Sequence, residues 1–346
     1  MKSFKLRTAV IWTALLVSPA VSGQEMVFQY SFPTEAMLAQ DVYLNYGAGL
    51  ALDGSGNVWI VDSGDGVIQI FDPAGRFLKK VGRPGQGPGE FSRPMTIHVT
   101  EERDLLVLDF GNQRMAVLSS EGEFKRSFPL RRRYEDFCVV KGKIYLVYNS
   151  FREDTKTVDV LSLDGDPLGS LGEAPDFGPV VPDLVRTAHF KVISAAPEGR
   201  LLVGWTFFPI VQAIDVGRNE TLTSIEIDHP ELKKRYRHNL GEFNKNDAPQ
   251  IYYTVQRTRA HRGGFLASIP AERIEFLDCD LKGKVRATYW APKPEEGYLG
   301  RDFVCREDGG TTWIYILQTR PDSKVNVYKI EARRPLTPPR ARPGFP

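Results

Sequence analysis

Apolar residues in this chain gather in short runs, and they rarely recur at the spacing of a helix. The runs are rich in Val, Ile, Leu, Tyr and Phe, and residues such as Gly, Asp, Asn and Pro separate them. Short runs of β-branched and aromatic residues between turn residues are typical of strands. The pattern therefore predicts an all-β chain built from many short strands.

The first two groups of runs repeat one another. The segment NVWIVDSGDGVIQIFDPAGRFLKKVG aligns without gaps over its centre with DLLVLDFGNQRMAVLSSEGEFKRSF. Asp62 aligns with Asp109 and Gly75 with Gly122, each pair 47 residues apart. Each unit reads as four strands joined by turns. A repeat of this length with four strands in each unit predicts the blades of a β-propeller.

Looser copies of the unit follow and predict a six-bladed β-propeller of four-stranded antiparallel blades over residues 24–330. The blades are expected at residues 49–82, 93–130, 135–172, 190–227, 253–290 and 301–330. The last unit has three strands, and a separate strand at 26–32 precedes the first unit. We therefore expect the N-terminal strand to join the last blade as its outermost strand. This closure of the ring would remove exposed sheet edges.

The two ends of the chain differ from the repeats. Residues 1–23 combine a basic start, a short apolar run and small residues, which is the layout of a secretory signal peptide. The apolar run is too short for a stable anchor, so we expect no transmembrane anchor after cleavage. The sequence thus predicts an exported protein, periplasmic or extracellular. Residues 331–346 are rich in Pro and Arg and are predicted to form a disordered tail.

The first unit and the stretch that follows it resemble NHL-repeat propellers, in an exported bacterial-type form. The matching residues of the first unit are Gly56, Asn57, Asp62, Gly64, Gln69, Phe71, Asp72, Gly75, Phe77 and Gly82. The resemblance is clear over residues 49–130 and implies the fold. It implies no single activity, because NHL-like propellers include ligand-binding sensors, protein- and RNA-binding modules and a few lyases and hydrolases.

The stretch VGRPGQGPGEFSRP, Val81–Pro94, superficially resembles a glycine-rich phosphate loop. A phosphate loop needs a helix N-terminus after the glycines, where backbone N–H groups converge on the anion. Here another strand is expected near Met95, and three prolines remove donors. The glycines are therefore expected to return the chain from one blade to the next. Asp62 and Asp109 are likewise interpreted as turn residues at strand ends, not as a catalytic pair.

Composition narrows the possible partners. The net charge is +2, and export argues against RNA, so we expect no nucleic acid partner. Three cysteines are too few for a disulfide framework and are expected as thiols within strands. The motifs HExxH, G-x-S-x-G and CxxC are absent. The sequence thus favours a binding or scaffold module over an enzyme, with no cofactor predicted.

Arginines gather where the channel mouth of a propeller is expected. Arg257 and Arg259 alternate on one innermost strand, where they either face the wet channel or pair with acids such as Glu135, Asp136 and Asp302. A ring of guanidinium groups favours an anionic small molecule or glycan, although a protein or peptide partner stays open. The candidate ligand-binding residues at the mouth are Arg93, Arg133, His189, Tyr253, Arg257, Arg259 and Arg301.

The alternative function is a metal-dependent lyase or hydrolase with its site in the central channel. The resemblance includes amidating lyases and lactonase-like propellers, which hold a metal in the channel. His98, His189 and His261 are the candidate ligands, with Zn or Ca as the metal. Their sequence spacing shows no paired-ligand pattern, so separate histidines without a metal are the simpler interpretation.

Overall fold

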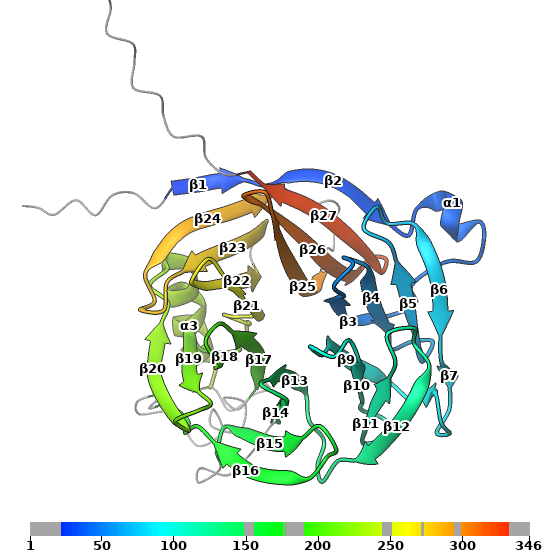
Figure 1. The fold of residues 1–346 in the computed structure, drawn as a ribbon. Coiled ribbons are helices and arrows are strands. Elements are labelled where there is room, and N and C mark those ends of the chain that lie inside the picture. Colours follow the sequence, from blue (N-terminus) through cyan, green and yellow to red (C-terminus); the bar gives the residue numbers. More distant parts are fainter. Residues whose placement is uncertain are drawn as a thin grey trace, which may run out of the picture.

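The strands of the protein form a ring of six sheets around a central axis (Figure 1). The structure is a computed structural model that describes residues 22–148, 156–175, 177, 190–243, 251–270, 273–293 and 299–331. The predicted all-β, six-bladed propeller is confirmed. Residues 1–21 and 332–346 lie outside the described residues, so the signal peptide and the tail stay predictions.

In the first four blades, strands that follow one another in sequence pair antiparallel from the axis outwards. Blade 1 contains β3 (Gly47–Leu52), β4 (Val58–Asp62), β5 (Val67–Phe71) and β6 (Phe77–Val81). Blade 2 contains β9 (Pro94–Val99), β10 (Leu105–Asp109), β11 (Arg114–Leu118) and β12 (Phe124–Pro129). Blade 3 contains β13 (Asp136–Val140), β14 (Lys143–Val147), β15 (Val158–Ser162) and β16 (Pro167–Leu171). Blade 4 contains β17 (Lys191–Ala196), β18 (Arg200–Trp205), β19 (Ile210–Asp215) and β20 (Glu220–Glu226).

The N-terminal segment closes the ring between the last two blades. Blade 5 contains β21 (Arg257–His261), β22 (Gly264–Pro270), β23 (Ile274–Cys279) and β24 (Val285–Ala291). Blade 6 contains β25 (Leu299–Asp308), β26 (Thr311–Arg320), β27 (Lys324–Ile330) and the N-terminal β2 (Val27–Phe32). The antiparallel pairing of β2 with β27 confirms the predicted closure. In addition, β1 (Ser22–Glu25) pairs in parallel with β24 as a fifth strand of blade 5, so one segment joins both blades.

The middle strands are buried on both faces because each blade packs against its neighbours. All five residues of β4 and of β10 are buried. One cluster joins blades 1 and 2 through side chains such as Trp59, Ile70 and Val107. Outer strands such as β6 expose most of their residues. This burial explains why the chain shows continuous apolar runs in place of the alternation expected of a half-buried strand.

Asp62 and Asp109 serve as turn residues, as the sequence indicated. The Asp62 carboxylate accepts hydrogen bonds from the backbone N–H groups of Tyr46 at 3.0 Å and Gly64 at 3.1 Å. Asp109 accepts one from the backbone N–H of Ser92 at 2.8 Å. Each carboxylate therefore ties the end of a second strand to the segment that enters the same blade.

The glycine-rich stretch is a connection whose polar groups are already satisfied. It contains the short strands β7 (Arg83–Pro84) and β8 (Glu90–Phe91). The Glu90 carboxylate accepts the N–H groups of Gln86 at 3.1 Å and Gly87 at 2.9 Å. Arg114 donates to the Gln86 and Gly87 carbonyl oxygens. Because these N–H groups already bind a carboxylate, the stretch is a fold element, and buried Phe91 packs between blades 1 and 2.

In the described ranges, two helices lie outside the blades. The short α1 (Glu35–Leu38) connects β2 to β3, and α3 (Pro230–Phe243) lies between blades 4 and 5 in sequence. Leu232 of α3 is buried in the core shared by these blades, and Tyr236 and Leu240 pack against an aromatic cluster of Trp205, Phe207 and Phe208. No helix in the described ranges has both the length and the apolar character needed to cross a membrane.

Candidate functional site

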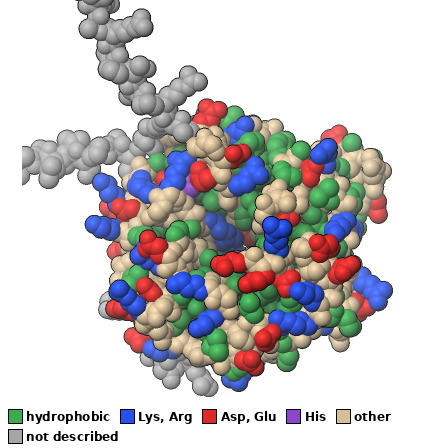
Figure 2. All heavy atoms as spheres, viewed as in Figure 1, with side chains coloured by type: hydrophobic (Ala, Val, Ile, Leu, Met, Phe, Trp, Pro, Cys, Tyr) green, Lys and Arg blue, Asp and Glu red, His purple; other side chains and the backbone are tan. Residues whose placement is uncertain are grey.

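A cavity of about 850 Å³, hereafter the chamber, occupies the central channel. All six innermost strands (β3, β9, β13, β17, β21 and β25) line it. Apolar residues such as Leu50, Ile97 and Ile193 form much of its wall, and His98 and Arg259 are among its polar residues. Figure 2 shows the hollow at the centre of the ring, with basic side chains at its bottom. The chamber is thus a mostly apolar space with a few polar groups.

Asp136 and Asp302 lie in blades 3 and 6, on opposite sides of the ring, and are held in the same way. Asp136 accepts hydrogen bonds at 3.0 Å from the N–H of the following residue and from that of Ile193 in blade 4. Asp302 accepts them from the following residue at 2.8 Å and from Leu50 in blade 1 at 3.3 Å. Each buried carboxylate therefore joins the innermost strands of two adjacent blades.

Arg257 and Arg259 are paired with these two aspartates. Arg257 Nη1 lies 3.2 Å from Asp136 Oδ2, and its Nε lies 3.4 Å from Asp302 Oδ1. Arg259 Nη2 lies 2.7 Å from the same Asp302 oxygen. Burial opposes the charge of Arg257, but Asp136 and Asp302 outweigh burial and raise its pKa. Of the two possibilities that the sequence left open for these arginines, the structure shows acidic partners, and their charges balance.

The remaining candidates surround the entrance to the innermost strands. We define the mouth residues by this position as Arg93, Arg133, Glu135, Tyr253 and Arg301. The guanidinium groups of Arg93 and Arg133 both lie over the Phe110 ring, 5.4 and 5.5 Å from its centroid. Both side chains are exposed. The Phe110 ring, which the sequence did not single out, thus holds two cations together.

The charge of Glu135 interacts both with arginines of the mouth and with Arg257, which is paired with Asp136 and Asp302 (the inner network). Burial raises the pKa of its carboxyl, and Arg301, Arg257 and Arg93 act in the opposite direction. Arg301 has a second notable feature, since its Nε is buried and has no hydrogen-bond partner among the described residues. A buried donor without an acceptor is unfavourable, and an anionic ligand is one group that would satisfy it.

Tyr253 contributes an exposed aromatic face to this region. Its ring is stacked on Phe207, with centroids 5.3 Å apart, and the residue is 45% exposed. The predicted ligand residue His189 lies outside the described residues. The structure therefore places Arg93 and Arg301 near Glu135 and Arg133 beside Arg93 on the Phe110 ring. Arg257 lies against the two aspartates, Arg259 lines the chamber, and His189 is left unplaced.

The histidines proposed for the alternative metal site lie in different surroundings. His98 lines the chamber, and burial followed by the charge of Arg259 lowers its pKa to about 4. His261 is buried between blades 5 and 6, with Nε2 3.0 Å from Glu307 and Nδ1 3.6 Å from Asp278. Among the described residues, no three His, Cys, Asp or Glu side chains are grouped as a metal site. His189 is not one of the described residues.

The three cysteines are free thiols within strands, as expected. The sequence did not show that Cys138 and Cys305 line the chamber, where burial raises the pKa of both. Lys191 is buried with its ammonium 5.4 Å from the Tyr148 centroid and 5.2 Å from that of Trp205, and burial lowers its pKa to about 8. The dipeptide Asp-Phe occurs in the innermost strands of blades 3 and 6, as Asp136-Phe137 and Asp302-Phe303, and was the available signal for the equivalent aspartates. Nothing in the sequence distinguishes Lys191.

Comparison with known proteins agrees with this architecture. A family model described as a 6-bladed beta-propeller matches residues 51–165. The chain is a six-bladed β-propeller. In sequence, a segment of 49 residues is 43% identical to the mouse E3 ubiquitin-protein ligase TRIM32. That match covers 14% of the propeller chain and 8% of the ligase, so it concerns a small part of both proteins.

Solved structures extend the similarity to most of the chain. A Bacteroides fragilis protein inferred to be exported superposes with a TM-score of 0.58 at 12% identity, covering 89% of the propeller chain and 95% of its own. A catalytically inactive variant of virginiamycin B lyase from Staphylococcus aureus, solved with quinupristin, gives 0.52 at 13% identity, with 84% and 98% covered. At these identities the likeness concerns the fold.

Proposed function

We propose that this propeller is a binding module that recognises an anionic ligand at its channel mouth. The observation that carries the proposal is a difference between two arginine groups. Arg257 and Arg259 are matched by two buried aspartates. Arg93 and Arg301 act on the Glu135 carboxyl, and Arg133 shares the Phe110 ring with Arg93. Within the described residues none of the three forms an ion pair.

The excess positive charge is held in place before any ligand arrives. Phe110 positions Arg93 and Arg133, while Arg301 keeps a buried Nε without an acceptor among the described residues. Guanidinium groups suit carboxylate and sulfate oxygens because they donate paired hydrogen bonds. A carboxylate, a sulfate or an acidic glycan would therefore match the mouth. The stacked pair Tyr253 and Phe207 offers an apolar surface beside it.

The inner arginines have a supporting role in this proposal. Arg257 is buried and contacts aspartates of blades 3 and 6 from blade 5, so it reaches across the channel. We infer that it forms the floor of the mouth and positions Glu135 relative to the ligand. Arg259 lies two residues further along β21, lines the chamber, and would hold the Asp302 carboxylate in position through its ion pair.

We further propose that the protein acts after export. The basic, apolar and small-residue segments of 1–23 support this inference, and one structural neighbour is itself inferred to be exported. Cell fractionation and mass determination of the mature chain test it. A chain that begins near Gln24 in the exported fraction is expected. An intact Met1 in the cytosolic fraction would contradict it.

Calorimetric titration with inorganic sulfate and with citrate tests the anion site. Arg93→Ala, Arg133→Ala and Arg301→Ala should each weaken binding by about 10-fold, the effect of losing one charge-assisted contact. Arg218→Ala is the matched control because Arg218 is exposed in the turn between β19 and β20. Equal affinity in all four variants, or no anion binding by the native protein, would overturn the proposal.

The metal-dependent lyase or hydrolase is kept as a second candidate because His98 faces the chamber. The fold similarity to a lyase adds nothing specific to it. His189 would have to approach His98 in this case, together with further ligands. Metal analysis of the purified protein separates this candidate from the binding module.

A further inference from the structure

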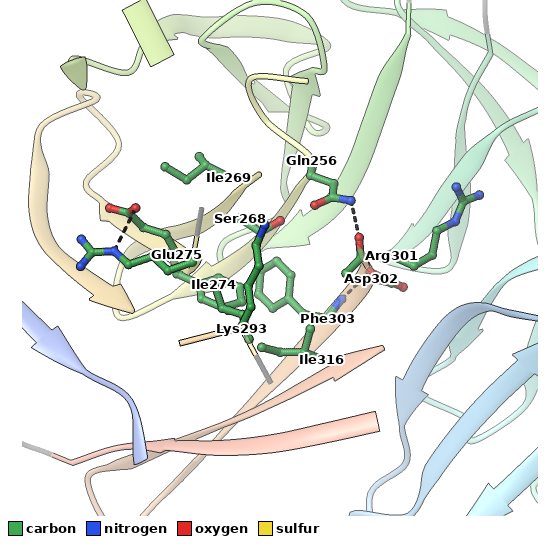
Figure 3. A pocket seen from close by; sticks show the side chains of 13 residues that line it. Gln256, Ser268, Ile269, Ile274, Glu275, Lys293, Arg301, Asp302, Phe303 and Ile316 are labelled. Carbon is green, nitrogen blue, oxygen red and sulfur yellow. Dashed lines mark hydrogen bonds and ion pairs between the residues drawn. The ribbon is translucent and has the colours of Figure 1, made fainter. Parts of the chain in front are cut away.

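We propose a second ligand site, in a groove between blades 5 and 6, for a small carboxylate that carries an aliphatic chain. The groove is partly open to solvent. It is lined by the end of β22, the middle of β26, the starts of β23 and β25, and Lys293 after β24. This site goes beyond the anion site at the mouth. The two sites share Arg301, but in Figure 3 its side chain points away from the groove.

Apolar side chains from both blades form the floor of the groove. Ile274 and Phe276 come from blade 5, and Phe303 and Ile316 come from blade 6. The rings of Phe276 and Phe303 meet edge to face, with centroids 4.8 Å apart. Strands hold all four residues, which are 1–6% exposed and belong to the core between the blades, so the floor is rigid before a ligand binds. Such a surface suits a flexible aliphatic chain.

The polar groups around the floor are already hydrogen-bonded. Gln256 donates its side-chain N–H to the Gly300 carbonyl oxygen and its backbone N–H to the Ser268 carbonyl oxygen. The Ser268 hydroxyl donates to the Arg257 carbonyl oxygen at 3.4 Å. In Figure 3, Gln256 reaches toward Gly300, at the side of the groove nearest Asp302. The groove therefore presents few unsatisfied polar groups, which disfavours a sugar or another highly polar ligand.

Charge distinguishes one end of the groove. In Figure 3, Glu275 lies at one side of the groove. Its carboxylate is paired with Arg273, whose Nε lies 3.5 Å from Oε2. The Arg301 side chain points away from the groove in the same view. Lys293 crosses the groove and, within the described residues, forms no ion pair or hydrogen bond. One uncompensated ammonium above an apolar floor is complementary to an aliphatic carboxylate.

A series of straight-chain carboxylates from butanoate to decanoate, measured by calorimetry, tests this site. Each methylene that enters the groove should tighten binding about 3- to 4-fold until the groove is full. Octylamine, with the same chain and the opposite charge, should bind more weakly than octanoate. Affinity independent of chain length would overturn the inference.

Variants place the binding in the groove. Lys293→Glu should weaken octanoate binding by about 10-fold or more, because it replaces attraction by repulsion. Lys282→Glu is the matched control, since Lys282 is an exposed lysine of the same blade in the turn after β23. Ser268→Leu, which fills the groove, should weaken decanoate more than butanoate. Unchanged octanoate affinity in both Lys293→Glu and Ser268→Leu would show that the chain binds elsewhere.

The same experiments separate this site from the mouth. Arg93→Ala and Arg133→Ala should weaken sulfate binding and leave octanoate binding unchanged. If octanoate and sulfate affinity fall together in those variants, the carboxylate binds at the mouth and the groove inference is wrong. If octanoate binds with the expected chain dependence while sulfate does not bind, the groove stands and the proposed mouth function fails.

Discussion

Arg257 and Asp136 are 121 residues apart in sequence and form an ion pair across the channel, with Nη1 3.2 Å from Oδ2. Asp136 also binds the backbone of blade 4, and Arg257 binds Asp302, which binds the backbone of blade 1. A single network thus connects blades 1, 3, 4, 5 and 6 near the axis. In a fold whose blades otherwise contact their neighbours, this network joins opposite sides of the ring.

Arg257→Ala should strongly destabilise the protein. The variant leaves Asp136 buried without its cation, and the loss of one partner of a buried pair destabilises by about 3–5 kcal/mol. Urea unfolding followed by tryptophan fluorescence measures the change. The control is Arg126→Ala, because the pair of Arg126 with Asp164 is exposed and should contribute less than about 1 kcal/mol. Equal effects of the two substitutions would contradict a structural role for the inner network.

The fold could be predicted from the sequence because the repeat carries it. Asp62 and Asp109 recur with the blade period, and the three-strand last unit required a partner from the N-terminus. The pairing of β1 with β24 was missed, since the sequence SGQE has no apolar pattern and relies on backbone hydrogen bonds. The length of helix α3 could not be predicted from the sequence, because its stability comes from the burial of Leu232 and from the packing of Tyr236 against blade 4.

The sequence predicted which types of residue form the site, but it did not predict which arginine pairs with which acid. The sequence placed arginines and acids at the mouth, but it could not assign Arg257 to Asp136 because only the closed ring brings the two together. Which arginines have an acidic partner and which do not is likewise decided only when the blades close into a ring. Arg259 pairs with Asp302, whereas Arg93 lies against Phe110, and both looked alike as isolated arginines near strand starts.

Phe32→Ala and Phe28→Ala should differ sharply although both residues lie on the strand that closes the ring. Phe32 is 1% exposed and packs against Phe71, with ring centroids 4.8 Å apart. Its truncation should destabilise by about 3–5 kcal/mol through the cavity that it leaves. Phe28 is 52% exposed, so its truncation should change stability by less than about 1 kcal/mol. Chemical unfolding measures both, and a small effect at Phe32 would argue against closure by β2.

His98 should stay neutral until the pH falls to about 4, because burial and then Arg259 lower its pKa from 6.5. The folded state therefore binds this proton less readily than the unfolded chain does. Its contribution to stability is complete above pH 6.5 and is lost as the pH falls toward 4, at most about 3 kcal/mol. NMR titration measures the pKa, with the signal assigned by its loss in His98→Asn. A titration near pH 6.5 would place the imidazole in water.

Metal analysis decides between the binding module and the metal-dependent enzyme. The binding module predicts no stoichiometric zinc or calcium in the purified protein, and an unchanged Tm after EDTA treatment. Bound metal would instead raise stability by mass action, so chelation would lower the Tm. Stoichiometric metal that is lost in His98→Ala and His189→Ala, with His238→Ala as the control, would favour the lyase or hydrolase.

Glu135→Gln should tighten anion binding at neutral pH and remove part of its pH dependence. Burial raises the pKa of Glu135, while Arg301 and then the other arginines oppose that shift, so the ionised carboxylate competes with an anion for the same cations. Protonation removes this competition, and sulfate affinity in the native protein should therefore rise as the pH falls through the raised pKa. Sulfate is the suitable probe because its charge is constant over this range.

The same substitution has a defined effect on stability. A carboxyl whose pKa is higher in the folded than in the unfolded state contributes fully to stability at pH values below its unfolded pKa. This contribution to stability is lost as the pH rises through the folded pKa. Glu135→Gln should thus stabilise the protein at pH 7 and have little effect at pH 4. Calorimetry with sulfate and urea unfolding at both pH values measure the two effects, with Glu123→Gln as the exposed control. Weaker sulfate binding by Glu135→Gln at pH 7 would mean that Glu135 orients the arginines for the ligand and does not compete with it.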